Sequence, residues 1–518
     1  MAKYVAGIDA GTTGTKVMIF TLDGKPVSHA YREYPCTYPN VGWVEQDPWL
    51  LWNALCEASR EAIAKSGVDP KEIGSVAISS QRGTFFGIDK NWQPLHDSIV
   101  WSDGRAINEV GWIADTIGPE RYHSISGAAI TSLWAYAKFK WVRDHLPELY
   151  EKTYKFVNGQ EWLLHQLGSE EMFTDPSSMA LHGMMDVSTL DWSDELLKAI
   201  DFDREKLPEI KPPARQVGVI SKKAAEQTGF AEGMPICVGG GDQQCAAVGA
   251  GVIKEGIAEI TIGTSSVMVA AVDKVYDDPK HEVLFSGHAN PGKFDMEGIS
   301  YASGATLKWW RDTFGAPEKA VAAASGVDEY QIIADMVAAN APAGSKGLLF
   351  YPFFAGQVTP YFCELAKGGY FGLDATHDRS CMARAVLEGV AYEMRMSIES
   401  MQRVLGRPFD IIRLSGGGSK SPLWRQIQAD IYGCPVEMLT VADCGLVGAA
   451  CLGATGAGIY GSLAEAVDAM VHTHGIIEPI KENVEVYNDY FEVYRDTFLA
   501  LRDSKAYDKL NQVRMKHW

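Results

Sequence analysis

The sequence contains no pair of cysteines at the C-x-x-C spacing, and its nine cysteines stand apart from one another. An odd number of isolated cysteines excludes a disulfide framework that uses all of them and disfavours zinc sites of the finger or ribbon type. Reduced thiols in a protein core are typical of the cytoplasm, which is therefore the expected compartment. The nine residues are Cys36, Cys56, Cys237, Cys245, Cys363, Cys381, Cys434, Cys444 and Cys451.

Positive charge and long apolar runs are also scarce. Lys and Arg number 47 against 66 Asp and Glu, so the formal net charge is -19 at pH 7. This balance argues against nucleic acid or an anionic membrane surface as the main partner. No run of 18 apolar residues occurs, and the opening KYVAGIDAG lacks the basic and apolar regions of a targeting signal. We therefore expect no membrane anchoring, and we expect any phosphate to be bound locally.

Two common nucleotide-binding signatures are missing. The pattern GxxxxGK[ST] does not occur, and the triple-glycine segment at 416–418 lacks the GxGxxG pattern with an acidic residue placed to read a ribose. These absences disfavour a P-loop NTPase and a nicotinamide-dependent dehydrogenase. Any nucleotide must be bound in another way.

The sequence does contain an alternation of strand-like and helical segments, in which one pattern occurs twice. A chain of 518 residues is long for a single core and predicts two large domains, expected at 1–250 and 251–518. The first opens with GIDAGTTGTKVMIF and the second with AEITIGTSSVMVAAV. Each segment places a Gly-Thr-rich turn between two strands that would pair. We interpret them as the starts of two related α/β domains.

Helix limits are clearest in two places. Asp47-Pro48 provides a cap and a first turn for a helix that continues to about Ser66, where Gly67 ends it. Late in the chain, SCMARAVLEGVAYEMRMSIESMQRVLG predicts a long amphipathic helix. After it, DIIRLSGGGSKSPLWRQIQADIYG predicts a strand, a glycine loop and a second helix.

The two Gly-Thr turns favour contact with phosphate. The glycines of GTTGT, residues 11–15, let backbone N–H groups converge on an anion, and the hydroxyls add donors. GTSS, residues 263–266, repeats the arrangement, and two such turns facing each other across a cleft would hold a polyphosphate from both sides. Asp9 ends the strand before the first turn. Its carboxylate would suit a hydrated Mg²⁺ that bridges phosphates, although an aspartate that only caps the turn has the same pattern.

A third glycine-rich segment places a carboxylate after a buried strand. GGGDQQ, residues 239–244, follows the apolar run PICV. A turn with a solvated acid explains this pattern on its own. A carboxylate at the end of a buried strand is otherwise costly unless something uses it, so a functional acid is the second interpretation. The residues alone leave both interpretations open.

The chain resembles the FGGY family of carbohydrate kinases, which includes glycerol kinase and xylulokinase. The resemblance runs nearly end to end and implies an α/β fold of two actin-like, ribonuclease H-type domains around a central cleft. It also implies that these domains close over ATP, Mg²⁺ and a sugar or polyol, and that the protein is a homodimer or another homo-oligomer. The segments that carry it are, in the family's order, GIDAGTTGTKVMIF, GWVEQDPWLLW, IVWSDGRA, VGGGDQQCAAVGAG, ITIGTSS, KGGYFGLDATHDR, ARAVLEGVAYE and LSGGGSKSPLWRQIQAD.

The resemblance also implies roles for particular residues. Asp242 would be the catalytic base that takes a proton from the acceptor hydroxyl, since phosphoryl transfer otherwise requires mainly positioning and charge neutralisation. Asp9 would serve the metal. The residues implied to bind the sugar are Gln81, Arg82, Trp101, Asp103 and Gln243, and those implied to bind ATP are Thr12, Thr13, Lys16, Gly263, Thr264, Gly304, Gly417, Gly418 and Ser421.

The substrate is indicated less sharply. Glycerol kinases have Arg-Glu where this chain has Arg82-Gly83, and the lost acid would open space for a ligand longer than glycerol. Xylulokinases have Met-His in place of Gln-Arg at that segment, although IVWSDGRA resembles their version and DQQ resembles the glycerol kinase version. Gln357 and Val358 replace the two charges of the GERTP segment found in many relatives.

The second half, including GISYASGATLKWWRDTFG, also resembles the autoinducer kinases. We expect a ketopentose such as xylulose as the substrate, with glycerol, erythritol or an autoinducer-type linear pentose as alternatives. A catalytically inactive nucleotide-binding regulator on the same fold is the alternative of another class.

Overall fold

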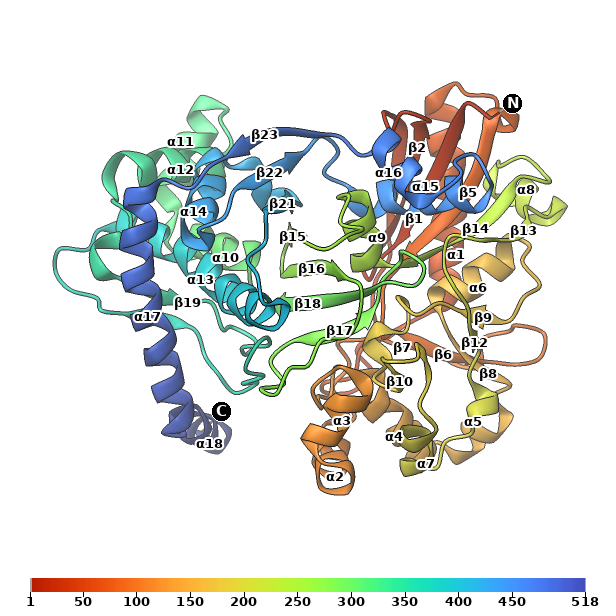
Figure 1. The fold of residues 1–518 in the computed structure, drawn as a ribbon, viewed down its shortest axis with the longest axis horizontal. Coiled ribbons are helices and arrows are strands. Elements are labelled where there is room, and N and C mark those ends of the chain that lie inside the picture. The colour runs from red at the N-terminus through yellow and green to blue at the C-terminus, as the bar shows by residue number, and fades with distance from the viewer. Residues whose placement is uncertain (1, 518) are drawn as a thin grey trace.

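The computed structural model describes residues 2–517, which form two large β-sheets with helices around them (Figure 1). The six strands of the first sheet are, in spatial order, β13 (Gln216–Val219), β14 (Pro235–Gly241), β5 (Ile73–Ser80), β1 (Tyr4–Ala10), β2 (Gly14–Thr21) and β3 (Pro26–Glu33). The seven strands of the second sheet are β17 (Leu284–Gly287), β18 (Phe294–Ser300), β16 (Ser266–Val272), β15 (Ile257–Ile262), β21 (Ile411–Ser415), β22 (Val436–Leu439) and β23 (Thr473–Ile477).

The two sheets share one topology. In the first, β1, β2 and β3 form an antiparallel meander, β5 and β14 add in parallel, and β13 pairs antiparallel at the edge. In the second, β15, β16 and β18 are the corresponding antiparallel strands, β21 and β22 are the parallel strands and β23 is the antiparallel edge, while β17 is an additional strand that pairs antiparallel with β18 at the other edge. The expected duplication and the α/β fold class are therefore confirmed.

Helices cover both faces of the first sheet, so its strands are apolar on both sides. Ile8 and Ile78 belong to the core beneath α1 (Pro48–Ser66) and α6 (Gly159–Leu167). Residues whose side chains lie on the other face of the sheet, such as Val5 and Phe20, pack with α15 (Cys444–Gly456) and α16 (Leu463–Met470). This alternation follows from the two-residue period of a strand. The helices α15 and α16 lie beyond residue 250 in the chain, yet they return to the first sheet (Figure 1).

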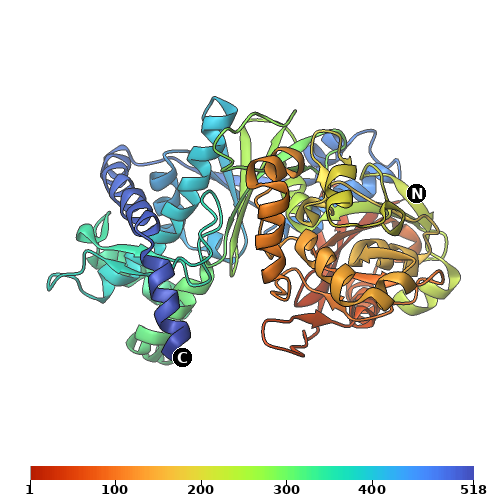
Figure 2. The same ribbon diagram turned by 90° about the horizontal axis from the view of Figure 1, so that it is seen from below.

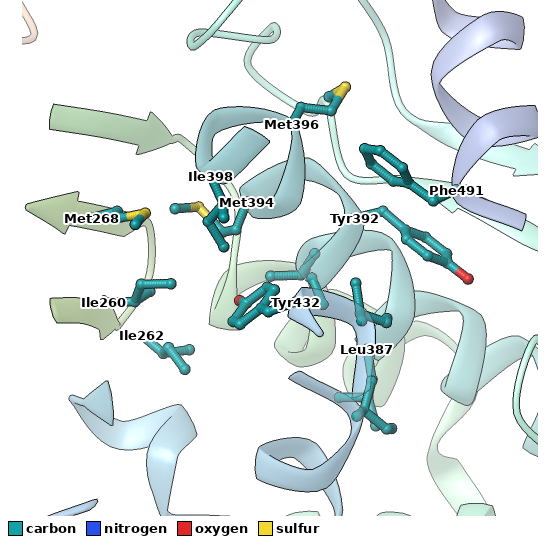
Figure 3. Close-up of a cluster of buried hydrophobic side chains, with 14 of the residues drawn as sticks. Ile260, Ile262, Met268, Leu387, Tyr392, Met394, Met396, Ile398, Tyr432 and Phe491 are labelled. Atoms are coloured by element: carbon teal, nitrogen blue, oxygen red, sulfur yellow. The ribbon is translucent and has the colours of Figure 1, made fainter. Parts of the chain in front are cut away.

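The two helices expected from the sequence are present. The Asp47 side chain caps α1 by accepting a hydrogen bond from the Trp49 N–H at 2.9 Å, and Gly67 ends the helix with φ 66°. The long helix is α13 (Arg379–Leu405), which packs on the second sheet. Figure 3 shows Met394 of α13 lying toward Met268 of β16 within this core.

Helix α9 (Asp242–Gly249) crosses α15 at very close range. A Cβ atom at Gly249 would lie 1.9 Å from the carbonyl oxygen of Cys444, and one at Gly448 would lie 1.8 Å from that of Cys245. Glycine is required because the two helix backbones touch there. Residues of α9 also share a buried apolar cluster with Val269 and its neighbours on β16. Helix α9 thus connects the first sheet to the second.

The remaining elements surround these sheets. A four-stranded sheet in the first half packs around aromatic side chains that include Phe85, Phe139 and Phe156. Figure 2 shows the C-terminal helices at the outer side of the second half. The four-stranded sheet consists of β4 (Glu45–Gln46), β7 (Ser98–Ile99), β6 (Phe85–Ile88) and β8 (Lys155–Asn158), and the short pairs are β9 (Phe173–Thr174) with β12 (Glu209–Ile210), β10 (Met185–Asp186) with β11 (Asp191–Trp192), and β19 (Leu349–Tyr351) with β20 (Gly369–Phe371). The other helices are α2 (Ile107–Ile117), α3 (Pro119–Ser126), α4 (Ala135–His145), α5 (Pro147–Lys152), α7 (Asp194–Ala199), α8 (Lys222–Thr228), α10 (Gly304–Phe314), α11 (Ala316–Ser325), α12 (Glu329–Asn340), α14 (Pro422–Tyr432), α17 (Lys481–Asp503) and α18 (Ala506–His517).

Two sequence expectations can be compared directly with this fold. Within residues 2–517, no helix combines the length and the apolar character that crossing a membrane requires. The nine cysteines are all free thiols, and most of them are buried. The expectation of unpaired core thiols is therefore confirmed.

Candidate active site

Asp242 is the first residue of α9 and directly follows β14, so its side chain emerges where a buried strand becomes a helix. The three glycines at 239–241 are explained by protein neighbours. A Cβ atom at the first would lie 2.0 Å from the Ile78 carbonyl oxygen, one at the second 2.5 Å from the Ser177 hydroxyl, and one at the third 2.5 Å from Cδ of Arg82. Protein atoms fill the space that each Cβ atom would need, so packing alone requires glycine at these three positions.

Arg82 joins Asp242 to a second carboxylate, which lies on the other sheet. Its Nε donates to Asp242 Oδ1 at 3.0 Å, and its two terminal nitrogens donate to the two oxygens of Glu297 on β18 at 2.7 and 2.8 Å. The side chains of Arg82 and Glu297 are each 3% exposed, whereas that of Asp242 is 32% exposed. Asp242 is therefore the member of this buried ion group that a ligand can reach.

The acids at the ends of β14 and β1 have raised pKa values. Burial raises the pKa of Asp242, and the guanidinium of Arg82 opposes this shift. Burial also raises the pKa of Asp9 to about 6, where a hydrogen bond from Ser79 opposes the shift and the charge of Asp242 adds to it. Carboxyl groups with raised pKa values that influence each other are typical of functional sites. A cation between them would relieve the repulsion.

Asp9 fits the role of a magnesium ligand as a single carboxylate. Within residues 2–517, no three His, Cys, Asp or Glu side chains gather into a metal-binding cage. Magnesium in phosphoryl-transfer enzymes usually has one or two protein carboxylates and completes its shell with water and phosphate oxygens. Asp9 Oδ1 accepts a hydrogen bond from Ser79 Oγ at 2.8 Å, and burial favours its neutralisation. The residues present therefore suit Mg²⁺ bound together with a nucleotide.

The turn after β1 directs its first threonine toward the protein. Thr12 Oγ1 donates to Gln81 Oε1 at 2.9 Å and accepts from Trp101 Nε1 at 3.0 Å. The Thr12 carbonyl accepts from Gln46 Nε2 at 2.8 Å. The structure thus brings Thr12, Gln81 and Trp101 together, but these polar atoms bond one another. Thr13, at the tip of the turn, is exposed and its Oγ1 lies 3.5 Å from the Tyr31 hydroxyl, so it is the more accessible of the two threonine hydroxyls.

Lys16 lies opposite Asp9 in the β1–β2 ladder and pairs with Asp443, with 2.7 Å between Lys16 Nζ and Asp443 Oδ1. Asp443 is the residue before α15. Sequence reasoning missed Asp443 because the two partners are 427 residues apart. Its place before the glycine-containing helix is the signal that could have found it. The lysine expected near phosphate is therefore held by a carboxylate at the same edge of the sheet.

The turn after β15 is supported by the start of α10. Ser303 N–H donates to the Thr264 carbonyl and Gly304 N–H donates to the Gly263 carbonyl, both at 2.9 Å. A Cβ atom at Gly304 would lie 2.5 Å from the Gly263 oxygen, so glycine lets the helix approach the turn. Thr264 is exposed at the tip. Gly263, Thr264 and Gly304, three of the residues expected to bind the nucleotide, therefore meet where α10 begins, and the first N–H groups of this helix are bonded to the turn.

The loop after β21 presents one glycine to open space. No atom of residues 2–517 lies within 4 Å of a Cβ placed at Gly417, whereas a Cβ at Gly418 would lie 2.2 Å from Cγ2 of Ile262. Gly417 therefore leaves room for a flat ligand, and Gly418 is required by packing. Ser421 caps α14 by accepting a hydrogen bond from the Trp424 N–H at 3.4 Å. Its hydroxyl thus supports the helix.

Two expected sugar ligands differ in their surroundings. Asp103 is fully buried, and it accepts hydrogen bonds from Arg105 Nε at 2.8 Å and from the Val44 N–H at 2.6 Å. The structure does not bring it to the surface of the site. Gln243 is partly exposed, and its N–H donates to Asp242 Oδ1 at 2.8 Å. Its side-chain oxygen is buried without a hydrogen-bond partner among residues 2–517.

Known proteins share this organisation. Residues 4–249 match the model of the N-terminal domain of the FGGY family of carbohydrate kinases, and residues 258–457 match that of its C-terminal domain. The xylulose kinase of Bacillus subtilis strain 168 is 28% identical over 489 residues, which cover 94% of this chain and 95% of the relative. The autoinducer-2 kinase of Klebsiella pneumoniae is 30% identical over 500 residues, which cover 94% and 92%.

Solved structures show the same architecture. The gluconate kinase of Lactobacillus acidophilus superposes with a TM-score of 0.89 at 25% identity, and the match covers 98% of this chain and 100% of that one. The glycerol kinase of Plasmodium falciparum with ADP superposes with a TM-score of 0.83 at 22% identity, covering 96% and 99%. The second match concerns the fold alone. The expected pair of actin-like domains is thereby confirmed.

Proposed function

Because this chain belongs to the FGGY family of carbohydrate kinases, we propose that it transfers the γ-phosphoryl group of ATP to a terminal hydroxyl of a short sugar or polyol. A ketopentose such as xylulose is the first candidate. The observation that carries the proposal is the partly exposed carboxylate of Asp242 at the start of α9, bound to a buried arginine. Carbohydrate kinase activity follows from the family, and the roles of the residues are our proposal.

Asp242 acts as the general base. Its carboxylate orients the acceptor hydroxyl and takes the proton while the hydroxyl oxygen forms a bond to the γ-phosphorus and the bond from phosphorus to ADP breaks. The products are the sugar phosphate, ADP and a proton on Asp242, which then passes to solvent. A positioned base contributes about 10²- to 10⁴-fold to the rate. Gln243, whose side-chain oxygen has no partner among residues 2–517, accepts a hydrogen bond from a second hydroxyl of the sugar.

The nucleotide is bound by the two Gly-Thr turns and by the glycine loop at 416–418. Thr13 and Thr264 are exposed at the tips of equivalent turns in the two halves, and Gly417 leaves open space beside the second sheet. Asp9 would hold Mg²⁺, which would neutralise charge on the phosphates. Lys16 adds positive charge at the same edge, where it also balances Asp443.

Gly83 does not leave the gap that the sequence suggested. Its φ is +68°, and a Cβ atom there would lie 3.2 Å from Cβ of Leu181 and 3.4 Å from Cβ of Trp101. A glutamate at this position would therefore be strained and crowded. The preference for a longer ligand therefore rests on the relatives and not on Gly83.

The names of the relatives support a substrate of this size. One similar protein is a xylulose kinase and another is an autoinducer-2 kinase, so we place xylulose first and an autoinducer-type linear pentose second. Glycerol and erythritol are the smaller alternatives. Small-molecule substrates agree with the net charge of -19, which disfavours nucleic acid.

A coupled ADP-release assay with glycerol, erythritol, xylulose, ribulose and an autoinducer-type linear pentose tests the proposal. We expect kcat/KM for the best four- or five-carbon compound to exceed that for glycerol by at least about tenfold, because a hydrogen-bonding site discriminates strongly against a ligand that lacks a matching hydroxyl. A preference for glycerol would contradict the proposed four- or five-carbon substrate, but not the kinase activity. Binding of ATP without turnover of any sugar would favour the inactive regulator.

A further inference from the structure

We propose that Glu297 is a positioning residue for phosphoryl transfer. It holds Arg82, and through Arg82 it fixes the Asp242 carboxylate and balances the charge beside it. This inference rests on the proposed function, in which Asp242 is the base. Glu297 is buried on β18, so it acts through Arg82 and not by contact with the sugar.

The geometry around Arg82 leaves little freedom. A guanidinium has five N–H donors in a fixed fork, and Arg82 uses one at Nε for Asp242 and one at each terminal nitrogen for Glu297. The absence of a side chain at Gly241 makes this possible, since a Cβ atom there would lie 2.5 Å from Cδ of Arg82. The last glycine of GGGD therefore provides the space through which Arg82 reaches the base.

The charge of Glu297 offsets the effect of Arg82 on the base. Burial produces the largest shift and raises the pKa of Asp242. The charge of Arg82 lowers this pKa, and the charge of Glu297 raises it. Without the Glu297 charge, Asp242 would be the one ion-pair partner left to Arg82 among residues 2–517. Asp295 on the same strand accepts a hydrogen bond from Ser286 and makes none with Arg82 among the described residues. The base would then be held more tightly by arginine and would be a weaker proton acceptor.

The same pair aligns the base with the nucleotide half of the molecule. Arg82 follows β5 of the first sheet, and Glu297 lies on β18 of the second. Strand β18 is paired with β16, which begins directly after the 263–265 turn. Glu297 thereby connects Asp242 to the strands that carry the proposed phosphate-binding turn. Gln244 of α9 adds a second contact, with 3.3 Å between its Nε2 and Glu297 Oε2.

The substitution Glu297→Gln removes the charge and keeps the size. We expect kcat to fall by on the order of 10²-fold, the scale of a misplaced base, while KM for the sugar and ATP changes less than about threefold because neither touches Glu297. The matched control is Glu393→Gln, which alters a buried carboxyl of α13 that bonds Ser300 on the same strand. It should retain kcat within about twofold. Circular dichroism and nucleotide titration establish that each variant is folded.

A double-mutant cycle separates positioning from general stability. If Glu297 acts through the base, Glu297→Gln should slow single-turnover phosphorylation by less than about twofold in the Asp242→Asn background, where the base is already absent. A full additional 10²-fold loss in that background would overturn the proposal, as would unchanged kcat in the single Glu297 variant.

A different result would contradict the proposed function itself, namely full turnover by the single variant Asp242→Asn. If Glu297→Gln does not fold, the cycle is repeated with Glu297→Asp. That variant keeps the charge and shortens the reach, and it should show a smaller loss of kcat that again vanishes in the Asp242→Asn background. A loss of equal size in both backgrounds would contradict the role of Glu297.

Discussion

Asp242 and Asp9 are two partly buried acids, and one difference between their surroundings is the guanidinium of Arg82 beside Asp242. Both are affected by burial, but Asp242 lies beside Arg82, which opposes the upward shift of its pKa. Asp9 has no arginine partner within the described residues 2–517, and burial raises its pKa to about 6. A base must be ionised at working pH, whereas a metal ligand is held ionised by its cation. The two environments suit the two proposed roles.

Glu393 provides a test of buried charge away from the site. It is 1% exposed, and burial raises its pKa to about 8, while the hydrogen bond from Ser300 opposes the shift. Its stabilising contribution is therefore complete below the unfolded pKa, near 4.5, and is lost as the pH rises through about 8. Glu393→Gln, which cannot ionise, should be more stable than the wild type at pH 9 by at least about 1 kcal/mol and similar at pH 5. Urea unfolding at both pH values measures this, and an equal difference at the two values would contradict it.

Most candidate residues were found from short sequence motifs, whereas their contacts with residues far away in the chain were not predicted. Asp242 was located from GGGD because the glycines and the acid are adjacent in the chain. Glu297 could not be located in this way, since it lies 215 residues from Arg82. The reason for the glycines was also invisible in sequence, because Ile78, Ser177 and Arg82 reach them only in the folded protein.

For helices and strands too, features set by neighbouring residues were predicted and long-range contacts were not. The limits of α1 were predicted because its cap, first turn and end are local, at Asp47, Pro48 and Gly67. The crossing of α9 and α15 was not predicted. Gly249 approaches Cys444 and Gly448 approaches Cys245, and the members of each pair lie about 200 positions apart in the sequence, a separation that no local pattern spans.

The crossing yields a prediction about Gly448. A methyl group there would lie 1.8 Å from the Cys245 carbonyl oxygen, so Gly448→Ala should push α15 from α9 and destabilise the protein by about 1–3 kcal/mol or more. It should also lower kcat, because α9 carries Asp242. The control is Gly111→Ala in α2, where no atom lies within 4 Å of the added Cβ and stability should rise by about 0.5–1 kcal/mol. Equal midpoints of urea unfolding for the two variants would contradict the close crossing.

At the scale of the whole molecule, the repeated Gly-Thr turns correctly indicated two related sheets. They did not indicate that α15 and α16, late in the chain, would cover the first sheet. Such a return of the chain depends on which apolar faces remain uncovered, and this is a property of the assembled fold. The expected homo-oligomer and the boundary at residue 250 stay predictions, which light scattering and limited proteolysis would examine.

Closure of the two halves is a further prediction at this scale. If the turns at 11–15 and 263–266 contact one nucleotide, a non-hydrolysable ATP analogue together with the sugar should shift the population toward a compact form that excludes water. Small-angle scattering should then give a smaller radius of gyration with both ligands than with neither. An unchanged radius at saturation, verified by titration calorimetry, would contradict closure.

The most direct measurement is the single-turnover rate of Asp242→Asn with ATP and the best sugar of the panel. Asparagine keeps the size of the side chain and an oxygen that accepts from Arg82 Nε, but it takes no proton from a hydroxyl. We predict that ATP and sugar bind within about threefold of the wild type, while phosphorylation slows by about 10²-fold or more. Phosphorylation at the wild-type rate would remove Asp242 as the base and contradict the account.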